Sequence, residues 1–593
     1  MLDNLRKLRN LLLENNLLNV YKNILYFFEN PYINDVERIV NSLQGAPKDD
    51  VRDILHEVIN LYETKISKYR DEIIYGQYLI WDQVLICYEK LCDIRTRIKM
   101  FNLNIFTDDY LSAVDEVKKI SKCYSEAQSE MTSFESILGV DRYLDRLCYT
   151  DIKPLEDILS EIKSDFESKL AKYKDIFVNK WSTTNVAPLI SHELLRYDGD
   201  NQICTLFECN KRNIVLFIID GFGYSQYQWH KNINNGAINY TYNENIFNWL
   251  EKVGCIKEYV LGSSYITDTS AGLAQIFTGK SQIETGIISS KVRIENSASF
   301  MDTKRLDSEN FNKIFNTENI SISQLVKIFN KKSKVFYGSR YGGNISGFSE
   351  FIFRGAEVFE IIPSERSFVI LKDELYKKEE GLYVVYLTNI DNSGHTMGAY
   401  SQFEKFEHEK FNMLLRNFLI EVASENQGQF DGKTTFIFTA DHGMAESSKF
   451  MINRKIIKEQ FNRSNLNNVR FVENNRAMLV YGLQSQDYFK ANDILVEYFN
   501  DLNVDVDILI KGTESYSNWY CTDIHNKISK LAPDIVIRLI SSGLFYSKDT
   551  SHHLLHYGGH GGASAGEIFV PLLQITLDNE LYSNIQNRFI NII

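Results

Sequence analysis

Apolar residues are spaced in two different ways along this chain, and the spacing changes shortly after residue 200. In the first part they recur at intervals of three and four, as in Leu5, Leu8, Leu11 and Leu12. This spacing places them on one face of a helix. Glycine, which weakens helices, is rare there, since only four of the 31 glycines precede residue 201. We therefore predict a largely helical N-terminal domain over residues 1–205, with no chemical motif and suited to packing or to binding a partner.

From residue 213 onward the apolar residues form short continuous runs instead. Runs of this kind, bounded by polar turns, are typical of strands buried on both faces of a sheet. Helical stretches separate them, and this alternation predicts an α/β fold with a mostly parallel central sheet flanked by helices. We expect a catalytic domain over residues 206–593, with a cap or insert around 447–552. The runs are Asn213–Ile219, Leu382–Leu387, Thr435–Phe438, Ala477–Tyr481, Ile535–Ile540 and Ile568–Ile575.

Residues that bind metals lie at the ends of the core runs, where parallel strands gather their ligands. Carboxylate oxygen and imidazole nitrogen suit divalent cations, and two histidines with one aspartate form an ordinary ligand set for catalytic zinc. Each residue alone is a weak signal, because an aspartate after a strand is usually a cap. Their combination predicts a centre for two metals. The residues are Asp220, Asp391, His395, Asp441, His442 and His560.

The order of these motifs resembles that of the alkaline phosphatase superfamily. The most similar branch is the type I phosphodiesterase/nucleotide pyrophosphatase group, including its PglZ-domain relatives. The matching segments are IIDGFGY, TSAGLAQIFTGKSQIETGI, DNSGH, TADHGM and HGGASAGEIFVPLL. The resemblance covers roughly residues 210–593 and leaves the helical N-terminal part unexplained. It implies an alkaline-phosphatase-like core and a metal-dependent phosphohydrolase.

The resemblance also implies which residues hold each of two divalent cations. Zinc is the expected metal, and manganese is the alternative because aspartate and histidine sites accept both. One cation would be bound by Asp391, His395 and His560. The other would be bound by Asp220, Asp441, His442 and the hydroxyl of Thr269.

The nucleophile implied by the resemblance is Thr269, which lies nine residues before the Thr278 of Phe-Thr-Gly. Thr267 and Ser270 are rivals, because a small shift of the alignment would select either. The physical argument favours Thr269. Residues 270–277 read as the opening of a helix, and free amides at a helix N-terminus favour an alkoxide and a phosphoryl group.

Part of the phosphate-binding chemistry departs from the family pattern. Where eukaryotic members carry an asparagine that binds the transferred phosphoryl oxygen, this chain has Ser289, Ser290 and Lys291. Lys291 is a candidate phosphate contact, and a solvated surface lysine is the alternative. Three further histidines either enter the site or belong to a polar loop. They are His552, His553 and His556.

The expected activity is hydrolysis of phosphodiester or nucleotide pyrophosphate bonds through a phospho-threonine intermediate. Its substrate would be a phosphorylated small molecule, a nucleotide or an oligonucleotide. A phosphomonoesterase is an alternative of similar chemistry. A second alternative is a PglZ-type component of a bacterial anti-phage defence or signalling system, which would act on oligonucleotides or as an assembly partner. The N-terminal domain would then dock to another protein.

Composition and charge indicate the class of protein and its cellular location. The chain has 593 residues, 44% hydrophobic and 24% charged, which indicates a folded protein of two or three domains. The net charge of −13 argues against a broadly basic nucleic-acid surface. No apolar stretch is long enough for a signal sequence or a membrane span, and the eight cysteines form no CxxC pair. We therefore expect a cytoplasmic protein with reduced thiols and no membrane partner.

Overall fold

The chain forms two compact units in the computed structural model, one made of residues 1–102 and 126–166, the other of 103–125 and 167–593. This division falls within two long helices, so the boundary expected at residue 205 stays a prediction. The histidines at 552, 553 and 556 lie outside the described residues. The structure describes residues 72–101, 109–137, 149–195, 211–232, 245–293, 300–315, 317–338, 346–360, 366–377, 379–425, 433–446, 451–519, 531–546 and 557–590.

The described part of the first unit is helical, as the spacing of its apolar residues predicts. Leu91, Ile94 and Ile98 recur at three and four along one helix and are all buried. Ion pairs such as Lys90–Glu130, at 2.6 Å, lie at the surface and contribute little to stability. The elements are α5 (Glu72–Met100), the second part of α6 (Tyr110–Ile137) and the first part of α7 (Tyr149–Asn179).

The second unit is built around a seven-stranded sheet with the order β2-β17-β8-β1-β7-β5-β6. Strands β8, β1, β7, β5 and β6 are parallel, and β17 is antiparallel to both of its neighbours. The predicted α/β fold with a mostly parallel sheet is therefore confirmed. The strands are β1 (Asn213–Ile219), β2 (Lys257–Gly262), β5 (Lys332–Tyr337), β6 (Glu357–Glu360), β7 (Gly381–Leu387), β8 (Thr434–Thr439) and β17 (Phe569–Leu577).

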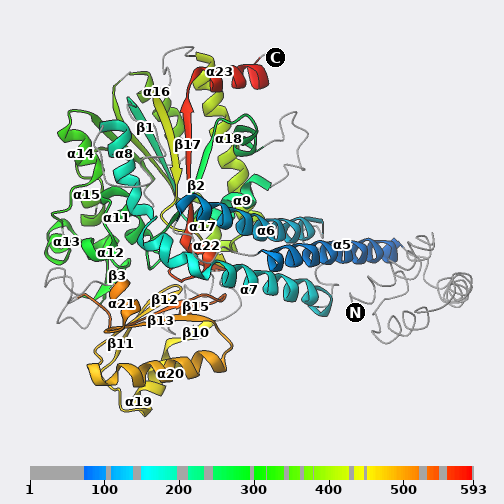
Figure 1. Ribbon diagram of the computed structural model, residues 1–593, viewed down its shortest axis with the longest axis vertical. Coiled ribbons are helices and arrows are strands. Elements are labelled where there is room, and N and C mark those ends of the chain that lie inside the picture. Colours follow the sequence, from blue (N-terminus) through cyan, green and yellow to red (C-terminus); the bar gives the residue numbers. More distant parts are fainter. Residues whose placement is uncertain are drawn as a thin grey trace, which may run out of the picture. The chain divides into compact units, whose positions relative to one another are not determined.

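Helices cover both faces of this sheet, which explains the continuous apolar runs (Figure 1). Every residue of β1, β7 and β8 is buried. Phe217 of β1 stacks on Phe438 of β8, with ring centroids 4.7 Å apart, and on Phe368, at 5.6 Å. One face carries α8 (Val186–Leu195), α11 (Thr269–Thr278) and α14 (Ile322–Ile328), and the other carries α9 (Tyr224–Asn232) and α18 (Gln402–Glu425).

Residues 451–546 contain a second, antiparallel sheet with the order β11-β12-β14-β13, drawn in orange and brown in Figure 1. One face of this sheet buries Phe461 and Phe499 from its own helices. The other face packs against the core of the unit through residues such as Leu479 and Ile266. The elements are α19 (Arg454–Arg463), β11 (Arg470–Asn474), β12 (Ala477–Tyr481), α20 (Tyr488–Asp501), β13 (Val506–Ile510) and β14 (Ile535–Leu539).

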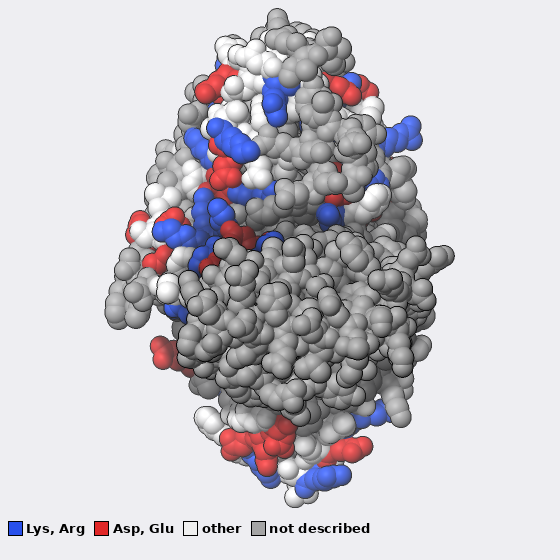
Figure 2. All heavy atoms as spheres, turned by 90° about the vertical axis from the view of Figure 1, so that its right-hand side faces the viewer, with Lys and Arg blue, Asp and Glu red and all other residues white. Residues whose placement is uncertain are grey.

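Acidic and basic side chains alternate over the described surface in Figure 2. On that face the described residues therefore show no continuous basic tract of the kind that binds a nucleic-acid backbone. None of the described helices combines the length and the apolar composition needed to cross a membrane.

Close packing at Gly272 sets the distance between α11 and the loop after β8. A Cβ at position 272 would lie 2.8 Å from the Cβ of Asp441 and closer still to its carbonyl oxygen. We expect Gly272→Ala to lower the free energy of unfolding by about 1–3 kcal/mol, because the overpacking outweighs the gain in helix propensity. Urea denaturation measures the change. Gly566→Ala is the control, since its methyl group would meet nothing nearer than 3.4 Å, and equal stability of the two variants would contradict the expectation.

Candidate metal centre and nucleophile

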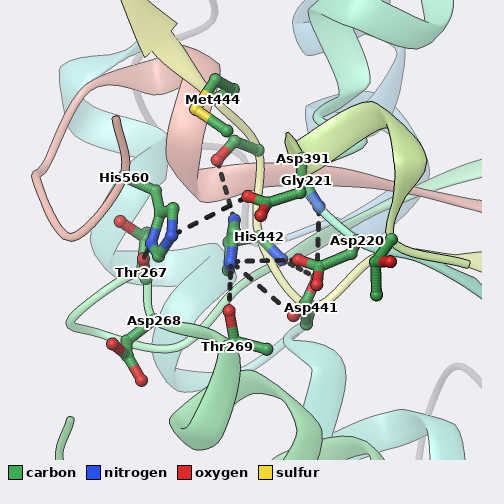
Figure 3. A network of polar contacts seen from close by, with 12 residues as sticks. Asp220, Gly221, Thr267, Asp268, Thr269, Asp391, Asp441, His442, Met444 and His560 are labelled. Carbon is green, nitrogen blue, oxygen red and sulfur yellow. Dashed lines mark hydrogen bonds and ion pairs between the residues drawn. The ribbon is translucent and has the colours of Figure 1, made fainter. Parts of the chain in front are cut away.

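The six predicted metal ligands and the predicted nucleophile come together at the carboxyl edge of the central sheet. Figure 3 shows five of the ligands and Thr269 turned toward one another from separate elements. Asp220 follows β1, Asp441 and His442 follow β8, and His560 follows β16 (Gly558–Gly559). Helix α17 (Asn389–Met397), which begins just after β7, carries Asp391 and His395, and Thr269 is the first residue of α11.

Backbone hydrogen bonds tie the ends of β1 and β7 together. The amide of Asp220 donates to the carbonyl oxygen of Leu387 at 2.8 Å, and the amide of Asp391 donates to the carbonyl oxygen of Asp220 at 3.1 Å. Asp391 and His395 are four residues apart on α17, so they share one face, with 3.4 Å between Oδ1 and Nε2. The two strand ends therefore deliver three side chains to one place.

All three histidines use the same ring nitrogen to hold their orientation. In each, Nδ1 donates to a backbone carbonyl, which can only accept, so Nδ1 carries the proton. The lone pair of Nε2 then remains for a metal, which is the usual arrangement of metal-binding histidine. His395 donates to Gly558 at 3.1 Å, His442 to Gly443 at 3.0 Å and His560 to Thr267 at 2.8 Å.

The three carboxylates each leave one oxygen without a hydrogen-bond partner in the structure. These atoms are Oδ1 of Asp220, Oδ1 of Asp391 and Oδ2 of Asp441. All three side chains are buried, and a buried carboxylate oxygen without a partner is unfavourable. Nε2 of His442 lies 3.5 Å from the first and 3.6 Å from the third. Oxygen atoms and imidazole nitrogens in this arrangement fit small divalent cations.

Charge repulsion and burial shift the pKa values in the direction that cations would reverse. Burial, together with Asp391 and Asp441, raises the pKa of Asp220 well above its usual value. Burial and Asp391 raise the pKa of Asp441 to about 7. Burial, with His442 as a neighbour, lowers the pKa of His560 well below its usual value. Both effects penalise charged groups in a buried site, and a divalent cation would favour the carboxylate and the neutral imidazole.

The ligand atoms fall into two groups, each gathered within 4.8 Å. One group is Asp220, Asp441 and His442, which are three of the four residues expected to hold one cation. The other is Asp391, His442 and His560, in which His442 stands where His395 was expected. His395 lies next to Asp391 at the more open side of the centre. The division of the ligands between two cations stays a prediction.

Of the three hydroxyl groups considered as nucleophile, that of Thr269 faces the ligands. Its Oγ1 lies 3.1 Å from Nε2 of His442, which can accept the hydroxyl proton in a hydrogen bond. The side chain of Asp268 caps α11 by accepting from the amide of Ser270 at 2.9 Å. Thr269 therefore stands at the positive end of a ten-residue helix.

The two rival hydroxyls make hydrogen bonds elsewhere. Thr267 Oγ1 accepts from the amide of Gly561 at 2.8 Å and donates to the carbonyl oxygen of Gly562 at 3.1 Å. Ser270 Oγ lies 3.0 Å from Ser290 Oγ and 3.1 Å from Thr303 Oγ1. Both hydroxyls thus hold neighbouring segments in place.

The predicted phosphate contact, Lys291, points its ammonium at the inserted segment, where it donates to the carbonyl oxygen of Glu473 at 3.1 Å. A second lysine, Lys304, lies in the field of the site carboxylates. Burial acts to lower the pKa of Lys304, but Asp268 and Asp220, followed by Asp391 and Asp302, outweigh it and raise the pKa. Lys304 carries no sequence motif. The bond between Thr303 and Ser270 places it near the site.

Tyr386 is another functional neighbour that the sequence did not reveal. Its hydroxyl, on β7, donates to Oδ2 of Asp220. The bond leaves Oδ1 of Asp220 as the oxygen that faces His442. In the sequence Tyr386 is one residue of a continuous apolar run, so nothing distinguishes it from a core residue.

We expect Asp441→Asn to lower the bound divalent metal from about two to about one per chain, because an amide is a weaker ligand than a carboxylate. Metal analysis of dialysed protein by mass spectrometry measures the content. Asp578→Asn is the control, since this carboxylate caps a helix away from the ligands by accepting from the amide of Leu581 at 2.8 Å. A wild-type protein that binds no metal would contradict the metal centre.

Comparison with solved structures returns ectonucleotide pyrophosphatases/phosphodiesterases. Murine ectonucleotide pyrophosphatase/phosphodiesterase 5 aligns over 61% of this chain and 87% of its own, with 14% identity and a TM-score of 0.43. An inactive variant of the murine protein in complex with AMP gives the same values. The human protein gives 13% identity and a TM-score of 0.41 over the same shares of the two chains. No curated protein matches the chain in sequence.

The family profile named Type I phosphodiesterase / nucleotide pyrophosphatase matches residues 214–562, which is more than half of the chain. The matched region begins in β1, just before Asp220, and ends just after His560, so it includes all six predicted ligands and Thr269. The chain belongs to the type I phosphodiesterase/nucleotide pyrophosphatase family, whose reaction is the hydrolysis of phosphodiester and pyrophosphate bonds.

Proposed function

We propose that this protein hydrolyses a phosphodiester or a nucleotide pyrophosphate with two divalent cations and with Thr269 as its nucleophile. The observation that supports this most directly is the position of the Thr269 hydroxyl. It lies at the N-terminus of α11 and 3.1 Å from His442, beside three buried carboxylates that each have an oxygen without a partner. This combination provides a nucleophile, a site for cations and free amides for a phosphoryl group.

The residues expected to hold the cations fit that role by their chemistry. One cation would be held by Asp391, His395 and His560, and the other by Asp220, Asp441, His442 and the Thr269 hydroxyl. Zinc is the metal we propose, with manganese as the alternative. When bound, the cations would favour loss of the hydroxyl proton and neutralise charge on the phosphoryl oxygens.

The proposed reaction has two steps, in which the phosphoryl group is first transferred to Thr269 and then to water. Oγ1 of Thr269 loses its proton and attacks the phosphorus atom, the leaving oxygen departs with the electron pair of its bond to phosphorus and takes up a proton, and the phosphoryl group remains on the threonine. Amides in the first turn of α11 face the negative phosphoryl oxygens. The oxygen of a water molecule then bonds to the phosphorus atom and the bond between phosphorus and Oγ1 breaks. A proton from the water restores the hydroxyl group, and the phosphorylated product leaves.

Turnover of a substrate panel tests this proposal. We expect hydrolysis of bis-p-nitrophenyl phosphate in zinc or manganese, and little of p-nitrophenyl phosphate. Thr269→Ala should abolish hydrolysis and keep most of the bound metal, because the other ligands remain. Mass spectrometry of the wild-type protein quenched during turnover should find phosphate on Thr269.

Other outcomes of the panel favour the alternatives. Faster turnover of the monoester would support a phosphomonoesterase. Cleavage of short oligonucleotides in preference to small diesters would support the PglZ-type role in a bacterial defence or signalling system. If metal is bound and none of these substrates reacts, the proposed hydrolase is wrong and an assembly partner is favoured. Full activity of Thr269→Ala would show that Thr269 is not the nucleophile.

We further propose that Lys304, rather than Lys291, meets the phosphate of the substrate. Its ammonium lies in the field of Asp268, Asp220 and Asp391, whereas Lys291 already donates to a carbonyl oxygen. We expect Lys304→Ala to lower kcat/KM about 10–100-fold, as the loss of a hydrogen bond to a charged group does. Lys291→Ala is the matched control, and steady-state kinetics measure both. A larger loss in the control would return the role to Lys291.

A further inference from the structure

The turn between β11 and β12, residues Glu473–Arg476, reaches from the inserted sheet to the catalytic core. We call it the hairpin tip. Asn474 pairs with Ala477 at the end of the two strands, so Asn475 and Arg476 form the turn itself. Asn475 has a φ of +51°, a conformation that asparagine adopts more readily than most residues. The tip therefore presents Asn474 and Arg476 on either side of a tight turn.

Asn474 contacts the residue that caps the nucleophile helix. Its Nδ2 donates to Oδ2 of Asp268 at 2.7 Å, and both side chains are buried. The other oxygen of Asp268 accepts from the amide of Ser270 at 2.9 Å and from Oγ of Ser290 at 2.7 Å. In Figure 3 the Asp268 side chain lies on the opposite side of Thr269 from Asp441. Asn474 thus fixes the position of Asp268, the residue that caps the helix of the proposed nucleophile.

Arg476 contacts the segment that carries His560. Its Nε lies 3.0 Å from Oε1 of Glu567, and both side chains are fully buried. The guanidinium also donates to the carbonyl oxygens of Gly543, at 2.9 Å, and Leu539, at 3.3 Å. The backbone amide of Arg476 donates to the carbonyl oxygen of His560 itself, at 3.2 Å.

Glu567 connects Arg476 to the proposed metal ligand His560 through a series of hydrogen bonds. Its Oε1 accepts from the amide of Gly562 at 2.7 Å, and the neighbouring Gly561 donates to Oγ1 of Thr267 at 2.8 Å. The carbonyl oxygen of Thr267 accepts from Nδ1 of His560. A Cβ on Gly561 would lie 2.6 Å from the carbonyl oxygen of Asn474, so the loop and the tip are in direct contact.

Two series of contacts, or routes, start at the hairpin tip, one from Asn474 and one from Arg476, and they reach consecutive residues. The route through Arg476 ends on Thr267, the route through Asn474 ends on Asp268, and Thr269 follows directly. We infer that the hairpin tip is part of the active-site framework, in which Asn474 positions the nucleophile Thr269 and Arg476 positions the metal ligand His560. The inference rests on the proposed function and adds two positioning residues to it.

Two variants separate the two routes. Asn474→Leu removes the donor to Asp268 while keeping a side chain of similar size. The double variant Arg476→Met with Glu567→Gln removes both charges of the buried pair, because removal of one alone would leave an unpaired charge and endanger folding. Asn453→Leu is the matched control, since Asn453 caps α19 within the same insert and accepts from the amide of Lys455 at 2.9 Å.

Asn474→Leu should lower kcat about 10-fold or more with KM little changed, because a misplaced nucleophile affects the chemical step. Amide hydrogen exchange across residues 267–272 should become faster, and cobalt affinity should stay at the wild-type value. The double variant should instead lower cobalt affinity by about 10-fold and alter the cobalt absorption spectrum. The Asn453→Leu control should change none of these.

Exchange and cobalt binding need no turnover, so they test the hairpin tip even if the wild-type protein hydrolyses none of the substrates. Wild-type exchange in folded Asn474→Leu would overturn the role of Asn474. An unchanged cobalt affinity and spectrum in the double variant would overturn the role of Arg476. Equal effects of all variants, including Asn453→Leu, would show that the insert acts only through overall stability and would overturn the inference.

Discussion

Repulsion between three buried carboxylates, those of Asp220, Asp391 and Asp441, is the constraint on which this site depends. Burial removes the water that would screen them, and each keeps one oxygen without a hydrogen-bond partner in the structure. The backbone nevertheless holds them close, since the ends of β1 and β7 are bonded to each other. Opposite charge relieves the repulsion, so the centre suits divalent cations and a lysine, Lys304, in the same field.

The histidines and Thr269 are arranged around the three carboxylates in a way that suits bound cations. Each histidine donates a hydrogen bond from Nδ1 to a backbone carbonyl oxygen, which leaves Nε2 for a metal. Thr269 adds a hydroxyl at a helix N-terminus, where the partial positive charge would favour the oxygen anion that the proposed attack requires. The carboxylates and the Nε2 atoms thus suit cations, and the helix terminus suits a negatively charged phosphoryl group.

Much of the core could be predicted because burial on both faces leaves a continuous apolar run. This held for β1, β7 and β8, and the acidic and imidazole residues at their ends followed from the shared direction of parallel strands. Elsewhere a continuous apolar run predicted a strand but not the sheet to which that strand belongs. Ala477–Tyr481 and Ile535–Leu539 are strands of the antiparallel insert, since an apolar run records burial and not the identity of the neighbouring strand.

The sequence by itself therefore determined which residues could bind metal and where the helix of the proposed nucleophile begins, because those properties depend on residue type and local spacing. The tertiary structure decided which neighbours hold them. Tyr386, Asn474 and Lys304 have no local motif, and the partners of Tyr386 and Asn474 lie far from them in the sequence. It also separated Thr269 from Thr267 and Ser270, since the direction in which a hydroxyl points is set only when distant segments pack together.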